Sequence, residues 1–266
     1  MSTDIIATDL HKNMTDSLES ITTSYAGKRL YKTKRERYQD EWQTSPAAVG
    51  IEIERVAFTY ELARIALWVM VTGALSQKGK TFTISAKASD RLTQIIKTIT
   101  GDTTGRYAVQ KGIYLQGQPS SGKTFIMRSI CSMVHKAYYT GWYNQICLPY
   151  WFSYKELMLR ARREGSIAFL NEIFRDKKMI FLDDLGYVDD VQINLYGNKE
   201  VVIVHLIDIL YRMYTDKGAM IYITSNVDIS TIQSSYGQAT SDRLMEMVTP
   251  VTWTSGINFR TGQKVN

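Results

Sequence analysis

Residues 117–124, with the sequence GQPSSGKT, have the residue types and the spacing of a loop that binds phosphate groups. The glycines permit a tight turn and a close backbone approach, so that several N–H groups and the N-terminus of a following helix face the phosphates. Lys123 would neutralise the β- and γ-phosphates, and the hydroxyl of Thr124 would hold Mg²⁺. The sequence therefore predicts a nucleoside triphosphate site made of Gly117, Gln118, Pro119, Ser120, Ser121, Gly122, Lys123 and Thr124.

Two carboxylates, Asp183 and Asp184, follow an apolar run at residues 178–182 that is expected to be a buried strand. Ligands of an open parallel sheet bind outside the carboxyl ends of its strands, so both acids are expected near the triphosphate. Asp183 is the natural partner of Thr124 at Mg²⁺, directly or through water. Asp184 would then orient or deprotonate the attacking water. Two acids after a strand also form an ordinary turn, and only the phosphate loop makes them a predicted catalytic pair.

A third polar position, Asn226, follows another apolar run at residues 219–224. Its amide could hydrogen-bond the γ-phosphate or the lytic water if this run is a strand of the same sheet. Polar residues also end strands that have no site, so spacing alone leaves this role open.

The elements that must position these residues alternate between strand and helix from about Arg106 onward, which predicts a parallel α/β sheet. Before that point, a helix is expected at residues 89–100, with a start signal at Ser89 and Asp90. His205 is expected on the core-facing stripe of its helix. The other expected strands lie at 81–84, 111–116, 146–152 and 248–254, and the other expected helices at 51–74, 125–134, 155–163 and 199–215.

Composition narrows the class of protein. The chain has 266 residues, 44% of them hydrophobic, which suffices for one sizeable core and a smaller appendage. Its net charge of +6 suits a polyanionic partner. Cys131 and Cys147 have no companion cysteines or histidines, so neither a disulfide framework nor a zinc site is expected. The acidic N-terminus is unlike a signal peptide, and the most apolar run, at 62–71, is too short to span a bilayer.

Basic residues gather at two places. Residues 28–38 combine six bases with interleaved tyrosines, which fits a nucleic-acid contact by phosphate neutralisation and stacking. A solvated helical face or a flexible arm explains the same run equally well. A second group of bases follows the second expected core strand. The candidate DNA contacts are Lys28, Arg29, Lys32, Lys34, Arg35 and Arg37 in the first group, and Arg160, Arg162 and Arg163 in the second.

In this order, GQPSSGKT, FLDDLG, ITSN and the run YGQATSDRLMEM at residues 236–247 resemble the DnaC/IstB-like AAA+ ATPases, which include helicase loaders and transposition ATPases. The resemblance covers about residues 106–262, and the run at 195–198 before a long helix is similar to replication proteins of phages and mobile elements. It implies an AAA+ P-loop core with a five-stranded parallel sheet, a truncated or absent C-terminal lid, ATP and Mg²⁺.

The same resemblance implies three further roles. Asn226 becomes the sensor-1 residue, and Arg243 becomes an arginine finger that reaches the active site of a neighbouring subunit. Arg260 fits the sensor-2 position. The expected organisation is a polar, basic arm at 1–45, a helical partner-binding region at 46–105 and the ATPase core at 106–266.

These features lead to competing hypotheses. The first is a cytoplasmic, bacterial or phage-encoded ATPase that oligomerises on DNA, single-stranded rather than duplex, and delivers or remodels a replicative helicase. The second is a transposition ATPase that coats duplex DNA and directs a transposase. From another class, the chain could be a nucleotide-gated binding module with negligible turnover, or a small-molecule kinase with the same loop. No membrane partner is expected.

Overall fold

The computed structural model describes residues 59–77, 84–139, 147–186, 192–195 and 198–254, all of which belong to one compact unit. Side chains at 193–200 are outside this description. Among the helices that it contains, none is both long enough and apolar enough to cross a bilayer.

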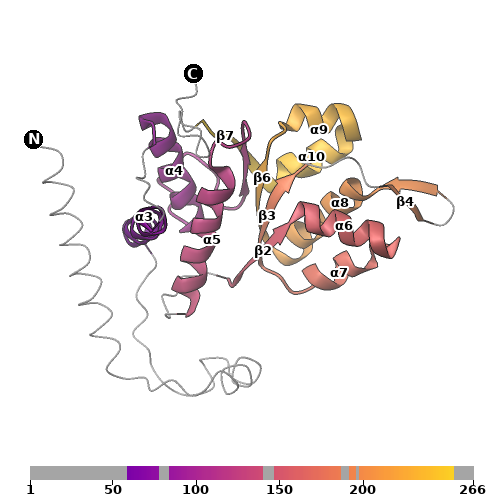
Figure 1. Ribbon diagram of the computed structural model, residues 1–266, viewed down its shortest axis with the longest axis horizontal. Coiled ribbons are helices and arrows are strands. Elements are labelled where there is room, and N and C mark those ends of the chain that lie inside the picture. The colour runs from indigo at the N-terminus through magenta and orange to yellow at the C-terminus, as the bar shows by residue number, and fades with distance from the viewer. Residues whose placement is uncertain (1–58, 78–83, 140–146, 187–191, 196–197, 255–266) are drawn as a thin grey trace, which may run out of the picture. The chain divides into compact units, whose positions relative to one another are not determined.

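A five-stranded sheet forms the centre of the structure (Figure 1), and all of its strand pairs are parallel. The spatial order is β2-β3-β6-β1-β7, so the chain crosses over between non-adjacent strands. This confirms the predicted five-stranded parallel sheet. The strands are β1 (Gly112–Gln116), β2 (Pro149–Ser153), β3 (Met179–Leu185), β6 (Met220–Ser225) and β7 (Val248–Thr252).

The register of the sheet brings three strand ends together. β6 lies between β1 and β3, with Gln116 of β1 opposite Ser225 of β6. On the other side of β6, Leu182 of β3 is opposite Ile223. The segments that follow β1, β3 and β6 therefore leave the same edge of the sheet, which is where open parallel sheets bind their ligands.

Alternate strand residues enter two separate cores, one on each face. Ile113 and Phe181 point into one cluster, whereas Tyr114 and Ile180 point into the other. Both faces are covered, which explains why the strands are apolar runs without polar alternation. The first face carries α3 (Tyr60–Ser76), α4 (Ala86–Ile99) and α5 (Lys123–Tyr139), and the second carries α6 (Tyr154–Glu164), α7 (Ala168–Phe174), α8 (Val202–Lys217), α9 (Ile229–Tyr236) and α10 (Gln238–Met247) (Figure 1).

Helix α4 begins earlier than its sequence signal predicts. Ser85, rather than Ser89 or Asp90, is the N-cap, and its hydroxyl accepts a hydrogen bond from the backbone N–H of Ala88. Both serines are good capping residues. The earlier cap prevails because it lets Ala88 join Leu92 and Ile95 on the buried face.

Helix α8 was predicted to start at Lys199, and this is wrong. Strand β5 (Asn198–Val201) occupies that position and pairs in antiparallel fashion with β4 (Gln192–Leu195). The helix begins only at Val202. Gly197 and Asn198 are residue types that suit a turn as well as a helix start, so the sequence pattern does not distinguish the two.

His205, predicted to be a core residue, is only partly buried, with its Nε2 inaccessible, whereas Leu206 and Ile209 of the same helix are in the core. Of the strand predicted at 81–84, only Ile84 is described, and it is not in a strand.

Candidate functional site

The loop predicted to bind phosphates connects β1 to α5, which begins at Lys123. Gly117 is required at its start by close packing, because a Cβ atom there would lie 2.3 Å from the carbonyl oxygen of Trp253. Gly122 has φ +89° and Ser120 has φ +64°, so the loop turns through the left-handed region twice. A tight loop that ends in a helix N-terminus directs backbone N–H groups toward an anion.

Trp253 supports this loop from beneath. Its side chain is fully buried, and its indole Nε1–H donates a hydrogen bond of 2.9 Å to the carbonyl oxygen of Ser121. Its backbone N–H donates a second, of 2.6 Å, to the carbonyl oxygen of Gln116. Trp253, the residue after the strand β7, thus holds the loop near both of its ends.

The side chain of Lys123 crosses from α5 to β6 and closes the loop. Its Nζ donates hydrogen bonds to the carbonyl oxygens of Gly117 and Gln118 at 2.7 and 2.8 Å. A third, of 2.8 Å, goes to Oδ1 of Asn226, directly after β6. The structure therefore brings the predicted phosphate lysine and the predicted sensor residue into direct contact.

Lys123 is only 4% exposed, and this burial lowers the pKa of its ammonium to about 8. The negative charges of Asp184 and Asp183 oppose the shift, and burial outweighs them. Desolvation disfavours a charged group that lacks full compensation. A triphosphate placed here would supply the missing negative charge, so the lysine fits its predicted role.

Thr124 and Asp183 also meet, because the hydroxyl of Thr124 donates a hydrogen bond of 2.9 Å to Oδ1 of Asp183. A hydroxyl and a carboxylate together suit Mg²⁺, which prefers oxygen ligands and keeps several waters. Within the part of the chain that the structure describes, no three His, Cys, Asp or Glu side chains form a metal-binding group. The residues present therefore fit a magnesium ion held mainly by nucleotide phosphates, as is usual at such sites.

Asp184 occupies an irregularity of β3. The strand register shifts between Leu182 and Leu185, and Asp184 has φ +56°. Bulges of this kind redirect a side chain at the edge of a sheet. Asp and Asn are enriched among residues with positive φ, which accounts for an aspartate in this position.

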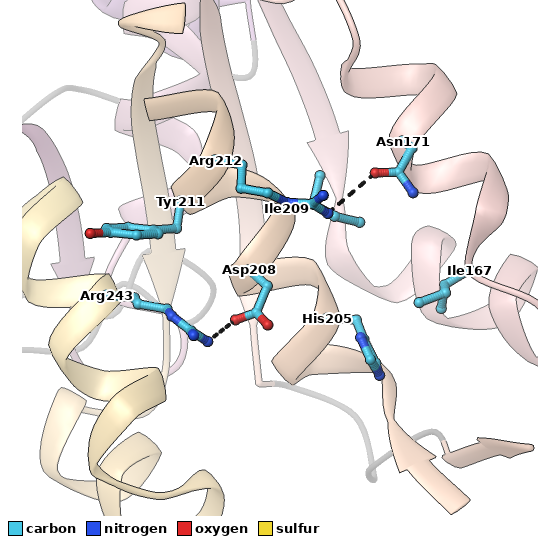
Figure 2. Close-up of a pocket in the computed structure, with 8 residues that line it drawn as sticks. All are labelled: Ile167, Asn171, His205, Asp208, Ile209, Tyr211, Arg212 and Arg243. Atoms are coloured by element: carbon cyan, nitrogen blue, oxygen red, sulfur yellow. Dashed lines mark hydrogen bonds and ion pairs between the residues drawn. The ribbon is translucent and has the colours of Figure 1, made fainter. Parts of the chain in front are cut away.

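Among the described residues, Arg243 has a different partner from those of Lys123, Thr124, Asp183 and Asn226. It lies on α10 and forms an ion pair with Asp208 of α8, at the edge of a pocket of about 430 Å³ (Figure 2). On the same pocket, Arg212 donates a hydrogen bond of 3.5 Å to Oδ1 of Asn171. The described residues that line the pocket come from α7, α8 and α10 and from Ile167 before α7, and His205 is among them. The ion-pair partner of Arg243 is therefore Asp208 of α8 and not a residue of the phosphate loop.

The candidate DNA contacts on α6 differ in exposure and in their partners. Arg162 and Arg163 are exposed in the last turn of α6, and Arg163 forms an ion pair of 3.9 Å with Glu164. Arg160 is engaged more closely, by Glu164 at 2.7 Å, and stacks over the ring of Phe169. Bases in a last helical turn also interact favourably with the helix dipole. The candidates at 28–37, and Arg260, lie outside the described residues.

Two residues of the site were missed by sequence reasoning. Thr224 sits inside the apolar run of β6 and bonds to both acids of β3. The available signal was a hydroxyl within a run that is otherwise apolar. Trp253 carried no signal beyond its size, because only the fold places the residue after β7 against the loop.

No protein-family model and no curated protein sequence matches the chain. Among solved structures, the DnaI crystal structure is similar with a TM-score of 0.50 at 16% sequence identity, over 77% of this chain and 96% of that one. The DnaC helicase loader gives 0.45 at 17%, over 65% and 93%. Domain III of the replication initiation protein DnaA from Thermotoga maritima gives 0.45 at 14%, over 65% and 64%.

At these identities the likeness concerns the fold and not the activity. It confirms the expected architecture, a five-stranded parallel α/β sheet in a fold similar to that of DnaI.

Proposed function

We propose that this chain is an Mg²⁺-dependent ATPase of DNA replication that oligomerises on DNA and delivers or remodels a replicative helicase. The observation that carries the proposal is the convergence of Lys123, Thr124, Asp183 and Asn226 at one edge of an AAA+ sheet, with direct hydrogen bonds between the first and last and between the middle two. A fold alone hosts many functions, and these contacts are what favour nucleotide hydrolysis.

Each residue of the convergence has a role in this proposal. The loop N–H groups and Lys123 bind the β- and γ-phosphates, and Asn226 orients the lysine and the terminal phosphate. Thr124 and Asp183 would hold Mg²⁺, which when bound neutralises charge on the phosphate oxygens. Asp184 positions the attacking water and accepts its proton.

The assembly and its partners rest on different support. Arg243 is 40% exposed as a side chain and is ion-paired with Asp208 rather than with a residue of the phosphate loop, which suits a finger supplied to the next subunit. The basic character of the chain and the exposed Arg162 and Arg163 favour DNA as the polyanionic partner. Helicase delivery follows from the resemblance of the motifs to helicase loaders.

The test uses the full-length chain. Phosphate release is measured with ATP and Mg²⁺ in the presence of single-stranded DNA, duplex DNA or neither, with Lys123→Ala as the inactive control. Affinity purification from the native host with ATP present then identifies what co-purifies. Activity with single strands and capture of a helicase support the proposal. A duplex preference with capture of a transposase would identify a transposition ATPase instead, and nucleotide binding without turnover would identify a nucleotide-gated binding module.

A further inference from the structure

Thr224 places a hydroxyl group in the most buried strand of the sheet. Its side chain is fully buried, and the other four residues of 221–225 in β6 are buried as well. Valine has nearly the same shape and is favoured in such a strand. Burial of a hydroxyl costs free energy unless hydrogen bonds compensate it. The polar atom at this position therefore needs a reason.

That reason lies in the two carboxylates of the neighbouring strand. The hydroxyl of Thr224 donates a hydrogen bond of 2.6 Å to Oδ1 of Asp183. The same oxygen of Thr224 accepts a bond of 2.9 Å from the backbone N–H of Asp184. The hydroxyl of Thr224 thus donates one hydrogen bond to Asp183 and accepts another from the next residue, Asp184.

Asp183 accepts hydrogen bonds from two hydroxyl groups, and Thr224 supplies one of them. Oδ1 also accepts the hydroxyl of Thr124, so that hydroxyls from β6 and from α5 converge on one carboxylate oxygen. Two donors on the same oxygen fix the rotation of the carboxylate about its χ2 angle. A metal-binding carboxylate depends on such orienting partners.

The hydrogen bond that the backbone N–H of Asp184 donates to Thr224 stabilises the backbone conformation of Asp184. This residue has φ +56° and sits in the register shift of β3, where the regular ladder to β6 is interrupted. Its N–H would otherwise lose its sheet partner, and a buried donor without an acceptor is costly. The Thr224 oxygen replaces that partner and so stabilises the left-handed turn that aims the Asp184 side chain.

We infer that Thr224 is the positioning residue that couples the metal-binding carboxylate to the water-orienting carboxylate. This inference rests on the proposed ATPase function and adds to it a residue that touches neither nucleotide nor metal. The hydroxyl sets both the direction of Asp183 and the backbone of Asp184, so its removal disturbs metal affinity and water activation together.

The experiment compares Thr224→Val, which removes the hydroxyl and keeps the shape, with Thr224→Ser, which keeps the hydroxyl. Loss of an orienting partner typically costs about 10- to 100-fold in metal affinity or activity. Thr224→Val is expected to lower kcat and to raise the Mg²⁺ concentration for half-maximal binding of a fluorescent ATP analogue, each within that range. Binding of the analogue in EDTA should not change, because the hydrogen bonds of Thr224 among the described residues go to Asp183 and Asp184 and not to the loop. Thr224→Ser should restore both values to within about threefold of the parent, since it restores both hydrogen bonds.

A matched control makes the same chemical change elsewhere. Thr98 on α4 is 3% exposed and donates to the carbonyl oxygen of Gln94, so Thr98→Val removes a buried hydroxyl outside β3 and β6, the strands that carry the two carboxylates and Thr224. It should leave Mg²⁺ dependence unchanged. Thr224→Val with the Mg²⁺ requirement and kcat of the parent would overturn the inference, and so would a Thr224→Ser variant as impaired as Thr224→Val. If the parent chain itself binds no nucleotide with or without Mg²⁺, the proposed function fails first, and the role of Thr224 fails with it.

Discussion

The guanidinium of Arg243 is ion-paired with the carboxylate of Asp208 in its own chain, across the contact between α10 and α8. This pair gives Arg243 two possible tasks, which have different consequences. It could hold the two helices together, or Asp208 could hold the arginine in place for a neighbouring subunit. Both side chains are only partly exposed. Removal of Arg243 and removal of Asp208 should have different effects under the two alternatives.

If Arg243 acts on a neighbour, Arg243→Ala should bind ATP normally and lose about 10³–10⁵ in kcat, the usual contribution of such an arginine. Mixed with Lys123→Ala, it should regain partial activity, because an intact loop can then face an intact arginine. Phosphate release from the mixture, with mixed oligomers confirmed by a tag, measures this.

Two controls separate the tasks. Arg212→Ala removes another arginine of the same pocket and should leave hydrolysis unchanged. Asp208→Asn breaks the ion pair but retains Arg243. A loss in Asp208→Asn as large as that in Arg243→Ala, without recovery in the mixture, would show that the pair only connects α8 and α10.

ATP affinity should depend on the protonation of Lys123. Its pKa is lowered to about 8, and the phosphates bind the charged form, so binding is accompanied by proton uptake once the pH exceeds that value. Affinity should therefore fall as the pH rises, by about tenfold between pH 7 and pH 9. Equilibrium titration with a fluorescent analogue across this range measures the effect. Lys123→Arg stays charged throughout and should show a flat profile, even if its affinity is lower. A pH-independent parent would contradict the assignment of Lys123.

Asp184→Asn should retain ATP binding and slow hydrolysis by about 10²–10⁴-fold, since an amide cannot accept the proton of the attacking water. Asparagine tolerates positive φ as aspartate does, so the bulge in β3 should persist. Single-turnover hydrolysis and nucleotide titration separate the two effects. Asp183→Asn should instead weaken Mg²⁺ binding and so raise the Mg²⁺ concentration that hydrolysis requires. If Asp184→Asn lost binding while Asp183→Asn did not, the two roles would have to be exchanged.

Exposed bases at the end of α6 should contribute to DNA affinity. Neutralisation of two phosphates contributes about 1.4 to the slope of log affinity against log salt for a single strand. Arg162→Gln combined with Arg163→Gln should reduce the slope by this amount and weaken binding at low salt. Arg64→Gln combined with Arg106→Gln is the matched control, because both arginines are exposed and lie outside α6, where they pair with Glu61 and Asp90. Equal salt slopes in the two double variants would show that α6 does not contact DNA.

Sequence reasoning was most successful where chemistry and hydrophobic pattern coincide. The parallel sheet follows from apolar runs separated by helical periods, and the loop at 117–124 from its glycines and its lysine. The contact between Thr124 and Asp183 was expected because strand ends of a parallel sheet meet at one edge.

The features that the sequence did not predict depend on contacts and burial that exist only in the folded chain. Ser85 and Ser89 are equivalent caps by type, and only the burial of Ala88 selects between them. The antiparallel pairing of β4 and β5 is local, and the residue types at 197–198 also suit a helix start. The ion pair of Arg243 joins residues 35 positions apart on two helices, and no pattern within either helix indicates it.

The indole of Trp253, which bonds to the loop carbonyl of Ser121, gives the protein a built-in optical reporter. Emission from a buried indole responds to changes in its hydrogen bond and surroundings, so nucleotide binding should alter the tryptophan fluorescence of the chain. The sequence contains five tryptophans, and subtraction of a Trp253→Phe spectrum isolates this one. Occupancy of the site could then be followed in real time without labelled nucleotide.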